Sequence, residues 1–355
     1  MPNSTPSHRA NNFDAVRLLA ALSVVFSHAF LIAEGTQSRE WFVRLTGNQC
    51  ALGLVGVFVF FAISGYLITE SWCRGPALGR FASRRFLRIY PALVLNTAIC
   101  ALLLGPVVTS LPLPEYFAGP ELRRYVWNMA TLWPGPLTLP GVVFSHNQVG
   151  WHINGAMWTL RAEAMMYAMV ALLGLSRILR LSTSLVLLGL GIAAIYFEKY
   201  LPLLGPFNTW AWLLGFYASG MVVYFLRDRL EFDWRGALLA LVALALFVWL
   251  HRFIMLFPLA GGYLVIWFAR RYDRWLDYSR FCGDLSYGLY IYGWPCEEFV
   301  MWLSGGRAAW WQVFFGSLAI AVPLAWLSWH LVEKWALHRV RQPAPAALAA
   351  VAPGE

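Results

Sequence analysis

Two ionisable side chains lie inside the first long apolar run of the sequence, FDAVRLLAALSVVFSHAF. Arg17 and His28 are eleven positions apart. In a helix this spacing is three turns, so both side chains leave one face about 16 Å from each other. An ionisable group in hydrocarbon costs about 2.5 to 3.5 kcal/mol on insertion scales, so each is a candidate for function. A histidine in such a place can act as a general base or as a nucleophile.

Structural roles for these two residues are also open at this point. Arg17 could anchor the helix at the membrane boundary, with its charge in the headgroup layer. Asp14 could pair with Arg17 across one helical turn. His28 alone could be a hydrogen-bonded structural histidine. The spacing therefore identifies candidates and leaves their roles undecided.

A buried carboxylate is expected in the segment GAMWTLRAEAMMYAM. Glu163 and Tyr167 are four positions apart and share one helical face, whereas Arg161 lies on another. A carboxylate in such a segment must be paired or protonated. Glu163 could therefore orient or charge-balance His28, or it could neutralise Arg161.

Three further segments offer groups for a substrate. RFASRRFLRIYPAL places Arg85 and Arg88 three positions apart, where they could form a fork for phosphates or simply mark a positive cytoplasmic loop. GLVGVFVFFAISGYLIT contributes the hydroxyl of Ser64, while close helix packing accounts for its glycines. In DLSYGLYIYGWP, Tyr290 and two neighbouring tyrosines are hydroxyl partners or part of an aromatic belt.

The composition predicts that a membrane-embedded scaffold positions these residues. The 355 residues are 59% hydrophobic and 13% charged, whereas a soluble domain has about 25% charged residues. The mean hydropathy is +0.58. We expect an all-α polytopic membrane protein within the lipid bilayer, with about ten transmembrane helices of about 20 residues. The expected spans are 13–33, 51–72, 89–111, 156–175, 184–197, 206–226, 236–250, 253–269, 284–304 and 311–332.

Basic residues predict how the chain is oriented and divided. Arg and Lys are concentrated in alternate connections between the expected spans, so both termini are expected in the cytoplasm. The longest connection, 112–155, then faces the outside. We expect a cytoplasmic tail at 1–12, a transmembrane domain at 13–335, and a disordered cytoplasmic Pro/Ala-rich tail at 336–355. The pair 236–250 and 253–269 is either a tight hairpin or one broken element.

Two other classes of function are disfavoured by composition. The net charge of +9 could suggest nucleic acid, but nearly all basic residues are arginines in short clusters between apolar runs. We expect no nucleic-acid partner. The five cysteines form no CxxC pair and have no histidine at metal-ligand spacing, so we expect neither a metal site nor a disulfide framework.

Taken together, four motifs in this order resemble the family 3 membrane acyltransferases over about residues 11–335. Members typically carry an F-D-x-L-R-like start followed by a histidine, an F-F-x-I-S-G-Y/F stretch, an R-x-x-R-I-Y-P run and a W-S/T-L-x-x-E-x-x-F/Y segment. The matching residues are Phe13, Asp14, Arg17 and His28; the stretch FFAISGY ending at Tyr66; Arg85, Arg88, Ile89, Tyr90 and Pro91; and Trp158, Thr159, Leu160, Glu163 and Tyr167.

The resemblance implies transfer of an acyl group, usually acetyl, from cytoplasmic acyl-CoA to a hydroxyl of a glycan, lipid-linked sugar or small molecule. It implies a multi-pass protein of the bacterial inner membrane, with acyl-CoA as donor substrate and no permanently bound cofactor. His28 would be the catalytic histidine, and Arg85 with Arg88 would bind the phosphates of coenzyme A. The remaining expected site residues are Arg17 and Glu163 as catalytic partners, and Asp14, Ser64, Trp158, Tyr167 and Tyr290 as substrate contacts.

The chain departs from the family pattern in one place. Many members read S-Y-x-x-Y-L-x-H-x-P where this chain reads SYGLYIYGWP, so Gly293 stands where those members have histidine. A polytopic transporter or flippase of a glycan or small molecule is the main rival function. The sequence lacks the internal repeat and the matched broken helices that would favour such a transporter.

Overall fold

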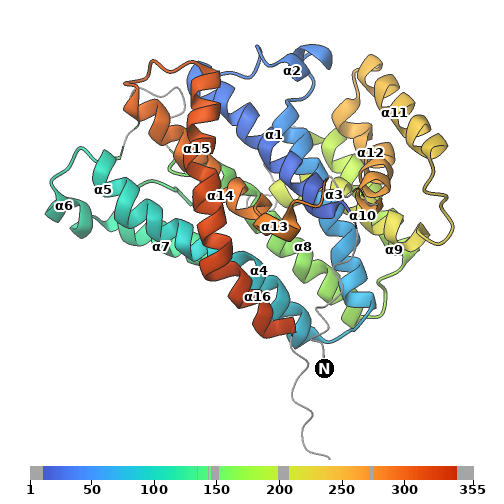
Figure 1. Cartoon of the computed structure of the whole chain (residues 1–355). Coiled ribbons are helices and arrows are strands. Elements are labelled where there is room, and N and C mark those ends of the chain that lie inside the picture. The colour runs from blue at the N-terminus through green and yellow to red at the C-terminus, as the bar shows by residue number, and fades with distance from the viewer. Residues whose placement is uncertain are drawn as a thin grey trace, which may run out of the picture.

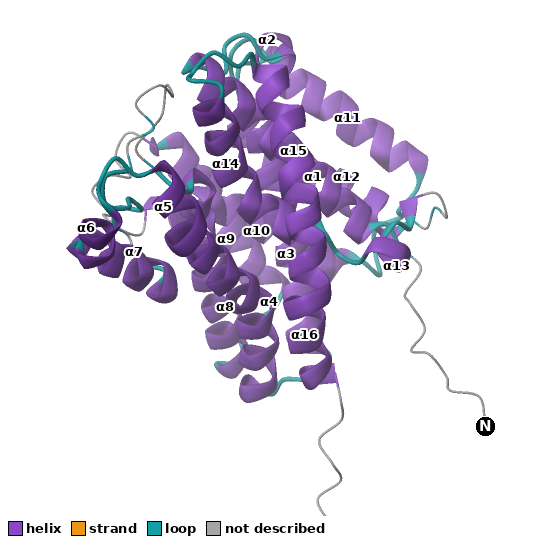
Figure 2. Ribbon diagram, turned by 60° about the vertical axis from the view of Figure 1, so that its left-hand side comes forward, coloured by secondary structure: helices purple, strands orange, loops and turns teal. Residues whose placement is uncertain are grey.

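The computed structural model describes residues 11–133, 135–142, 144, 152–198, 208–271, 273 and 276–341, and the regular secondary structure of this part of the chain is all helix (Figures 1 and 2). The expected tails at 1–12 and 336–355 lie largely outside it. Five helical stretches are long and apolar enough to cross a membrane. They are α1 (Phe13–Glu34), α3 (Leu52–Cys73), α4 to α5 (Leu78–Val108), α12 (Phe253–Arg270), and α15 to α16 (Trp310–His338).

The other helices fall into three groups. Shorter apolar helices are α9 (Leu181–Tyr196), α10 (Asn208–Leu226) and α11 (Trp234–Trp249). Two helices of similar length carry acidic residues, α8 (Trp158–Leu175) and α14 (Ser286–Leu303). The short elements are α2 (Trp41–Leu45), α6 (Leu113–Ala118), α7 (Pro120–Thr131), the 3-10 turn η2 (Gly155–Met157), α13 (Ser279–Cys282) and α16 (Lys334–Arg341). All-helical membrane character is thus confirmed, and each of the ten expected spans coincides with a helix.

One boundary was predicted wrongly. The arginine-rich stretch before residue 89 was expected to be a connection, but α4 begins at Leu78 and contains it. The stretch is amphipathic: Phe81 and Ile89 are buried in the bundle, whereas Arg85 and Arg88 line a cavity. Apolar residues at helical spacing with cations on the other face favour a helix over a loop. The helix presents those cations from a rigid element.

Small residues allow the central helices to approach closely. In the bundle α3 packs between α1 and α10. A Cβ atom on Gly65 would overlap the backbone of Tyr217 on α10, and one on Gly220 would overlap the backbone of Ala62 on α3. Such glycines replace side-chain layers with direct backbone contact, as is common in membrane bundles. The packing explanation for the glycines of α3 is therefore confirmed.

The helix α14 is fixed by a polar network around its proline. Pro295 has no N–H, so the carbonyl of Ile291 one turn earlier has no helical donor. The side-chain amides of Asn96 and Asn154 both donate to that carbonyl, at 3.1 and 2.7 Å. Buried backbone groups in a membrane protein must find such partners. The network ties the first half of α14 to α4 and to the segment before α8.

The connection between α11 and α12 is a tight hairpin. His251 adopts the left-handed conformation, with φ of 53°. The N–H groups of His251 and Arg252 donate to Val248 and Phe247 carbonyls at 3.0 and 2.9 Å. The first of the two alternatives for this pair is the correct one.

Candidate active site

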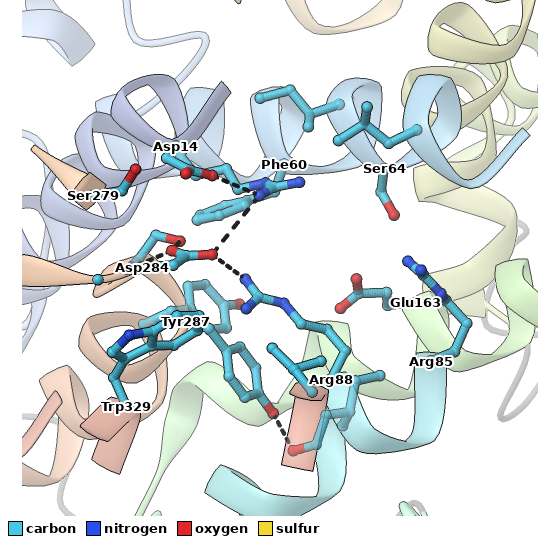
Figure 3. A pocket seen from close by; sticks show the side chains of 18 of the residues that line it. Asp14, Phe60, Ser64, Arg85, Arg88, Glu163, Ser279, Asp284, Tyr287 and Trp329 are labelled. Carbon is cyan, nitrogen blue, oxygen red and sulfur yellow. Dashed lines mark hydrogen bonds and ion pairs between the residues drawn. The ribbon is translucent and has the colours of Figure 1, made fainter. Parts of the chain in front are cut away.

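The larger of the two site cavities, here called the arginine cavity, has a volume of about 850 Å³. It lies at the end of the bundle where α1 and α4 begin, between α1, α3, α4, α8 and α14 (Figure 3). Its remaining wall is the end of the helical stretch from α15 to α16, here called the C-terminal helix. Most of the residues predicted from the sequence line it, although they come from five helices. They are Asp14, Arg17, Ser64, Arg85, Arg88, Glu163, Tyr167 and Tyr290.

A chain of ion pairs crosses one wall of this cavity. Arg17 contacts Asp14 at 3.2 Å and Asp284 at 3.8 Å, and Arg88 contacts Asp284 at 2.7 Å (Figure 3). Asp284 lies in the connection just before α14. Its burial alone would raise its pKa, but the Arg88 and Arg17 guanidiniums lower the pKa to about 2. Asp284 is therefore a carboxylate at neutral pH and compensates the charge of Arg88.

Arg85 differs from Arg88 in having no carboxylate partner among the described residues. Its Nε is buried without a hydrogen bond. Its guanidinium carbon lies 5.9 Å from the ring centre of Phe81 and 5.8 Å from that of Tyr167. Figure 3 shows the guanidinium directed to the same space as Ser64 and Glu163. Of the predicted arginine pair, Arg85 is the one whose charge is open to an anion.

Glu163 has a different partner from either of those expected. Its carboxylate accepts a hydrogen bond from the Tyr167 hydroxyl on the next turn of α8. Arg161 lies away from it, in the wall of the second cavity described below. His28 is not among the residues that line the arginine cavity. Within the described residues Glu163 forms no ion pair with His28 or with Arg161, so a role of Glu163 toward either residue stays a prediction.

The C-terminal helix supplies basic groups that were not predicted. His330, Lys334 and His338 recur every four residues and line the arginine cavity. This spacing puts them on one helical face, and it could have been recognised in the sequence. With them, six Arg and Lys side chains face three carboxylates around the cavity. The balance favours an anionic ligand.

His28 lies on α1 in a separate, tightly packed site. Its Nδ1 is 3.7 Å from Oε2 of Glu297 on α14. Its ring also packs edge-to-face against Trp294, with centroids 4.7 Å apart. The indole N–H of Trp294 donates to the carbonyl of His152 at 3.2 Å. Glu297 and Trp294 were missed from the sequence, although an acidic pair inside an otherwise apolar helix is a signal for function.

A second cavity, here called the tryptophan cavity, has a volume of about 690 Å³. It lies where α8 and α10 begin, and Thr159 and Leu160, next to Trp158 in the first turn of α8, line the arginine cavity. Among its lining residues are Asn128, Trp133, His152, Asn154, Gly155, Trp158, Arg161 and Asn208. Trp158 was expected to contact substrate, and it lines this cavity rather than the arginine cavity.

Residues of α14 connect the two cavities to His28. Tyr290 lines the arginine cavity, and its hydroxyl lies 2.5 Å from Oγ1 of Thr159. One turn later, Trp294 contacts His28 on one side and packs against Gly155 of the tryptophan cavity on the other. The Trp294 ring therefore lies between His28 and Gly155 in the wall of the tryptophan cavity, one turn along α14 from Tyr290 in the arginine cavity.

Comparisons with known proteins identify the family of the chain. An acyltransferase domain model matches residues 11–330. The chain is 30% identical to nodulation protein 10 of Rhizobium leguminosarum bv. viciae, over 94% of this chain and 95% of that protein. It is 28% identical to an O-acetyl transferase of Shigella phage Sf6, over 94% and 97% respectively. No solved structure matches. These matches favour an O-acyltransferase over a transporter, and the chain belongs to the family 3 membrane acyltransferases.

Proposed function

We propose that this protein transfers an acyl group, in the first place acetyl, from acyl-CoA to a hydroxyl group of a glycan, lipid-linked sugar or small molecule. The observation that carries the proposal is the arginine cavity, in which Arg85 forms no ion pair within the described residues, together with the partly buried histidine of α1. The name of the phage relative, an O-acetyl transferase, supports acetyl as the acyl group.

The donor fits the arginine cavity by charge and size. Coenzyme A carries phosphate groups, which Arg side chains bind through paired hydrogen bonds. Arg85 and the basic face of the C-terminal helix supply such donors. A volume of about 850 Å³ is near the upper end of the range for small-molecule sites. In this arrangement the thioester extends along Ser64 and Tyr290 toward His28.

His28 performs the transfer by one of two routes. As a general base, Nε2 removes the proton of the acceptor hydroxyl while the hydroxyl oxygen attacks the thioester carbonyl. The coenzyme A thiolate then leaves and takes up a proton. As a nucleophile, Nε2 attacks the thioester, forms an acyl-imidazole and passes the acyl group to the hydroxyl. Both routes convert acyl-CoA and an alcohol to an ester and free thiol.

The acceptor fits the tryptophan cavity. Trp133 and Trp158 are 64% and 42% exposed, and indole faces suit the apolar faces of sugar rings. The guanidinium of Arg161 lines the same cavity and adds hydrogen-bond donors for hydroxyls. We propose that the acceptor enters here, so that donor and acceptor reach His28 from different cavities.

For the topology we propose ten spans in a bacterial inner membrane with both termini in the cytoplasm. The basic residues of α4 and of the C-terminal helix support this orientation under the positive-inside rule. It places the arginine cavity on the side where acyl-CoA is found.

The proposal is tested by comparing host cells with and without the gene. Mass spectrometry of envelope glycans and secreted metabolites should find an acetyl ester that depends on the gene. The same product should form when membranes are supplied with acetyl-CoA radiolabelled in the acetyl group. Membranes carrying Arg85→Ala should need more acetyl-CoA for the same rate. Identical metabolite and glycan profiles, with no label transferred, would contradict the proposal.

A further inference from the structure

The carboxylate of Glu297 stands beside His28 without any other described partner. Glu297 has no exposed surface, and neither of its carboxylate oxygens accepts a hydrogen bond within the described part of the chain. A buried carboxylate left without hydrogen bonds costs several kcal/mol. The fold retains it 3.7 Å from the Nδ1 atom of His28.

The packing of α14 on α1 holds the carboxylate in that position. Gly293 lies against Val25, where a Cβ atom would come within 2.7 Å of Cγ2 of the valine. One turn further along both helices, Glu297 faces His28. The absence of a side chain at position 293 thus allows the close approach that brings the carboxylate to the imidazole.

We propose that Glu297 is a positioning residue, which directs the Nδ1–H of His28 toward its carboxylate and leaves Nε2 free to react. This inference rests on the proposed function of His28. A carboxylate next to one ring nitrogen selects the tautomer that keeps the proton on that nitrogen. It also stabilises the imidazolium that forms when the other nitrogen takes up a proton.

Trp294 completes the arrangement by restricting the ring. Its indole packs edge-to-face on the imidazole and is itself held by the His152 carbonyl and by Gly155. The imidazole is thereby confined between an aromatic ring and a carboxylate. The 3.7 Å separation closes to a hydrogen bond by a small rotation of the imidazole, which costs little when the ring gains a second proton.

The test is Glu297→Gln, with Glu40→Gln as the matched control. Glu40 is also fully buried, but its oxygens accept hydrogen bonds from Ser27 and Leu52. For Glu297→Gln, kcat should fall on the order of 10²- to 10⁴-fold. The KM for acetyl-CoA should stay within about twofold, because the donor cavity is untouched. Glu297→Asp should recover part of the lost kcat, because it restores a carboxylate. Glu40→Gln should keep kcat per folded molecule and lose thermal stability.

Three results would overturn this inference, and only the second of them also overturns the proposed function. If His28→Ala is inactive while Glu297→Gln keeps wild-type kcat, Glu297 has no positioning role and the inference is wrong. If His28→Ala keeps wild-type activity, the proposed role of the histidine fails, and the inference fails with it. If Glu297→Asp is no better than Glu297→Gln, the carboxylate is not the feature that matters and the inference is also wrong.

Discussion

Two buried glutamates serve neighbouring residues of α1 in opposite ways. Glu40 accepts a hydrogen bond from Ser27 Oγ at 2.7 Å and from the backbone N–H of Leu52 at 2.6 Å. Ser27 Oγ in turn accepts the N–H of Gly53 at 2.6 Å. The result is a closed network that fastens α1 to the start of α3.

Glu297 shows the contrasting case. Its carboxylate is equally buried, yet its one contact with a described cationic group is His28 at 3.7 Å. A carboxylate with all its hydrogen bonds contributes to stability, whereas one without them is a cost that a protein retains for function. The same contrast holds between Arg88, which Asp284 compensates, and Arg85, which has no carboxylate partner among the described residues. Mutation of a buried charged side chain that has its hydrogen bonds or ion pair should therefore lower stability. Mutation of one that lacks such partners should change the kinetics of the reaction.

The largest expected effect comes from the two adjacent residues on α1. His28→Ala should reduce kcat by about 10³-fold or more, because it removes the base or nucleophile, with little change in melting temperature. Ser27→Ala should do the reverse. The substitution leaves the Glu40 carboxylate and the Gly53 N–H each without one hydrogen-bond partner, which should lower the free energy of unfolding by about 1 to 3 kcal/mol. Turnover and thermal unfolding, measured on the same preparations, check both. Loss of kcat in folded Ser27→Ala would break the comparison.

A second effect concerns the compensated carboxylate of the arginine cavity. Asp284→Ala should destabilise the protein by about 2 to 3 kcal/mol at neutral pH. The folded pKa of Asp284 is about 2, below the ordinary value of about 3.9. The stabilisation is therefore fully present above about pH 4 and lost only as pH falls through 2. The difference in melting temperature between wild type and variant should be constant from pH 5 to 8. A difference that disappears at pH 5 would contradict this account.

The uncompensated arginine should show the opposite behaviour. Arg85→Ala should raise the KM for acetyl-CoA about 10- to 150-fold, as expected for loss of charge-assisted hydrogen bonds worth about 1.5 to 3 kcal/mol. Its melting temperature should be unchanged or higher. Arg161→Ala, in the tryptophan cavity, is the control and should leave the donor KM unaltered. Equal effects of the two substitutions on donor KM would remove the distinction between the cavities.

The smallest effect is expected at the proline of α14. Asn154→Ala removes one of two amides that satisfy the Ile291 carbonyl, and Asn96 remains. The expected cost is about 1 kcal/mol, with kcat reduced only severalfold. A melting curve and a turnover measurement are sufficient. A kcat loss as large as that of His28→Ala would mean that Asn154 acts in the reaction rather than on the helix.

The sequence predicts the helices well because lipid imposes a simple rule on them. Long apolar runs become helices, and the ionisable residues inside those runs are costly enough to stand out. Arg17 and Glu163 were recognised in this way, and the structure brings them to one cavity. The start of α4 was missed because arginines at its beginning lower the hydropathy of an amphipathic helix.

The partners of these residues could not be predicted, because they depend on how distant helices pack. Glu297 meets His28 only through the close approach of α14 to α1 at Gly293. Asp284 meets Arg88 across nearly two hundred positions of sequence. Spacing along one helix reveals which residues share a face, but it does not reveal which face of another helix will lie opposite.

The most direct test of the central claim is the stoichiometry of transfer by purified protein in lipid nanodiscs. Acetyl-CoA radiolabelled in the acetyl group is supplied together with the envelope glycan fraction of the host. Wild-type protein should release one free thiol for each labelled ester formed. His28→Ala should produce neither above background, although it folds and melts like wild type. Labelled ester formed by His28→Ala at the wild-type rate would contradict the account.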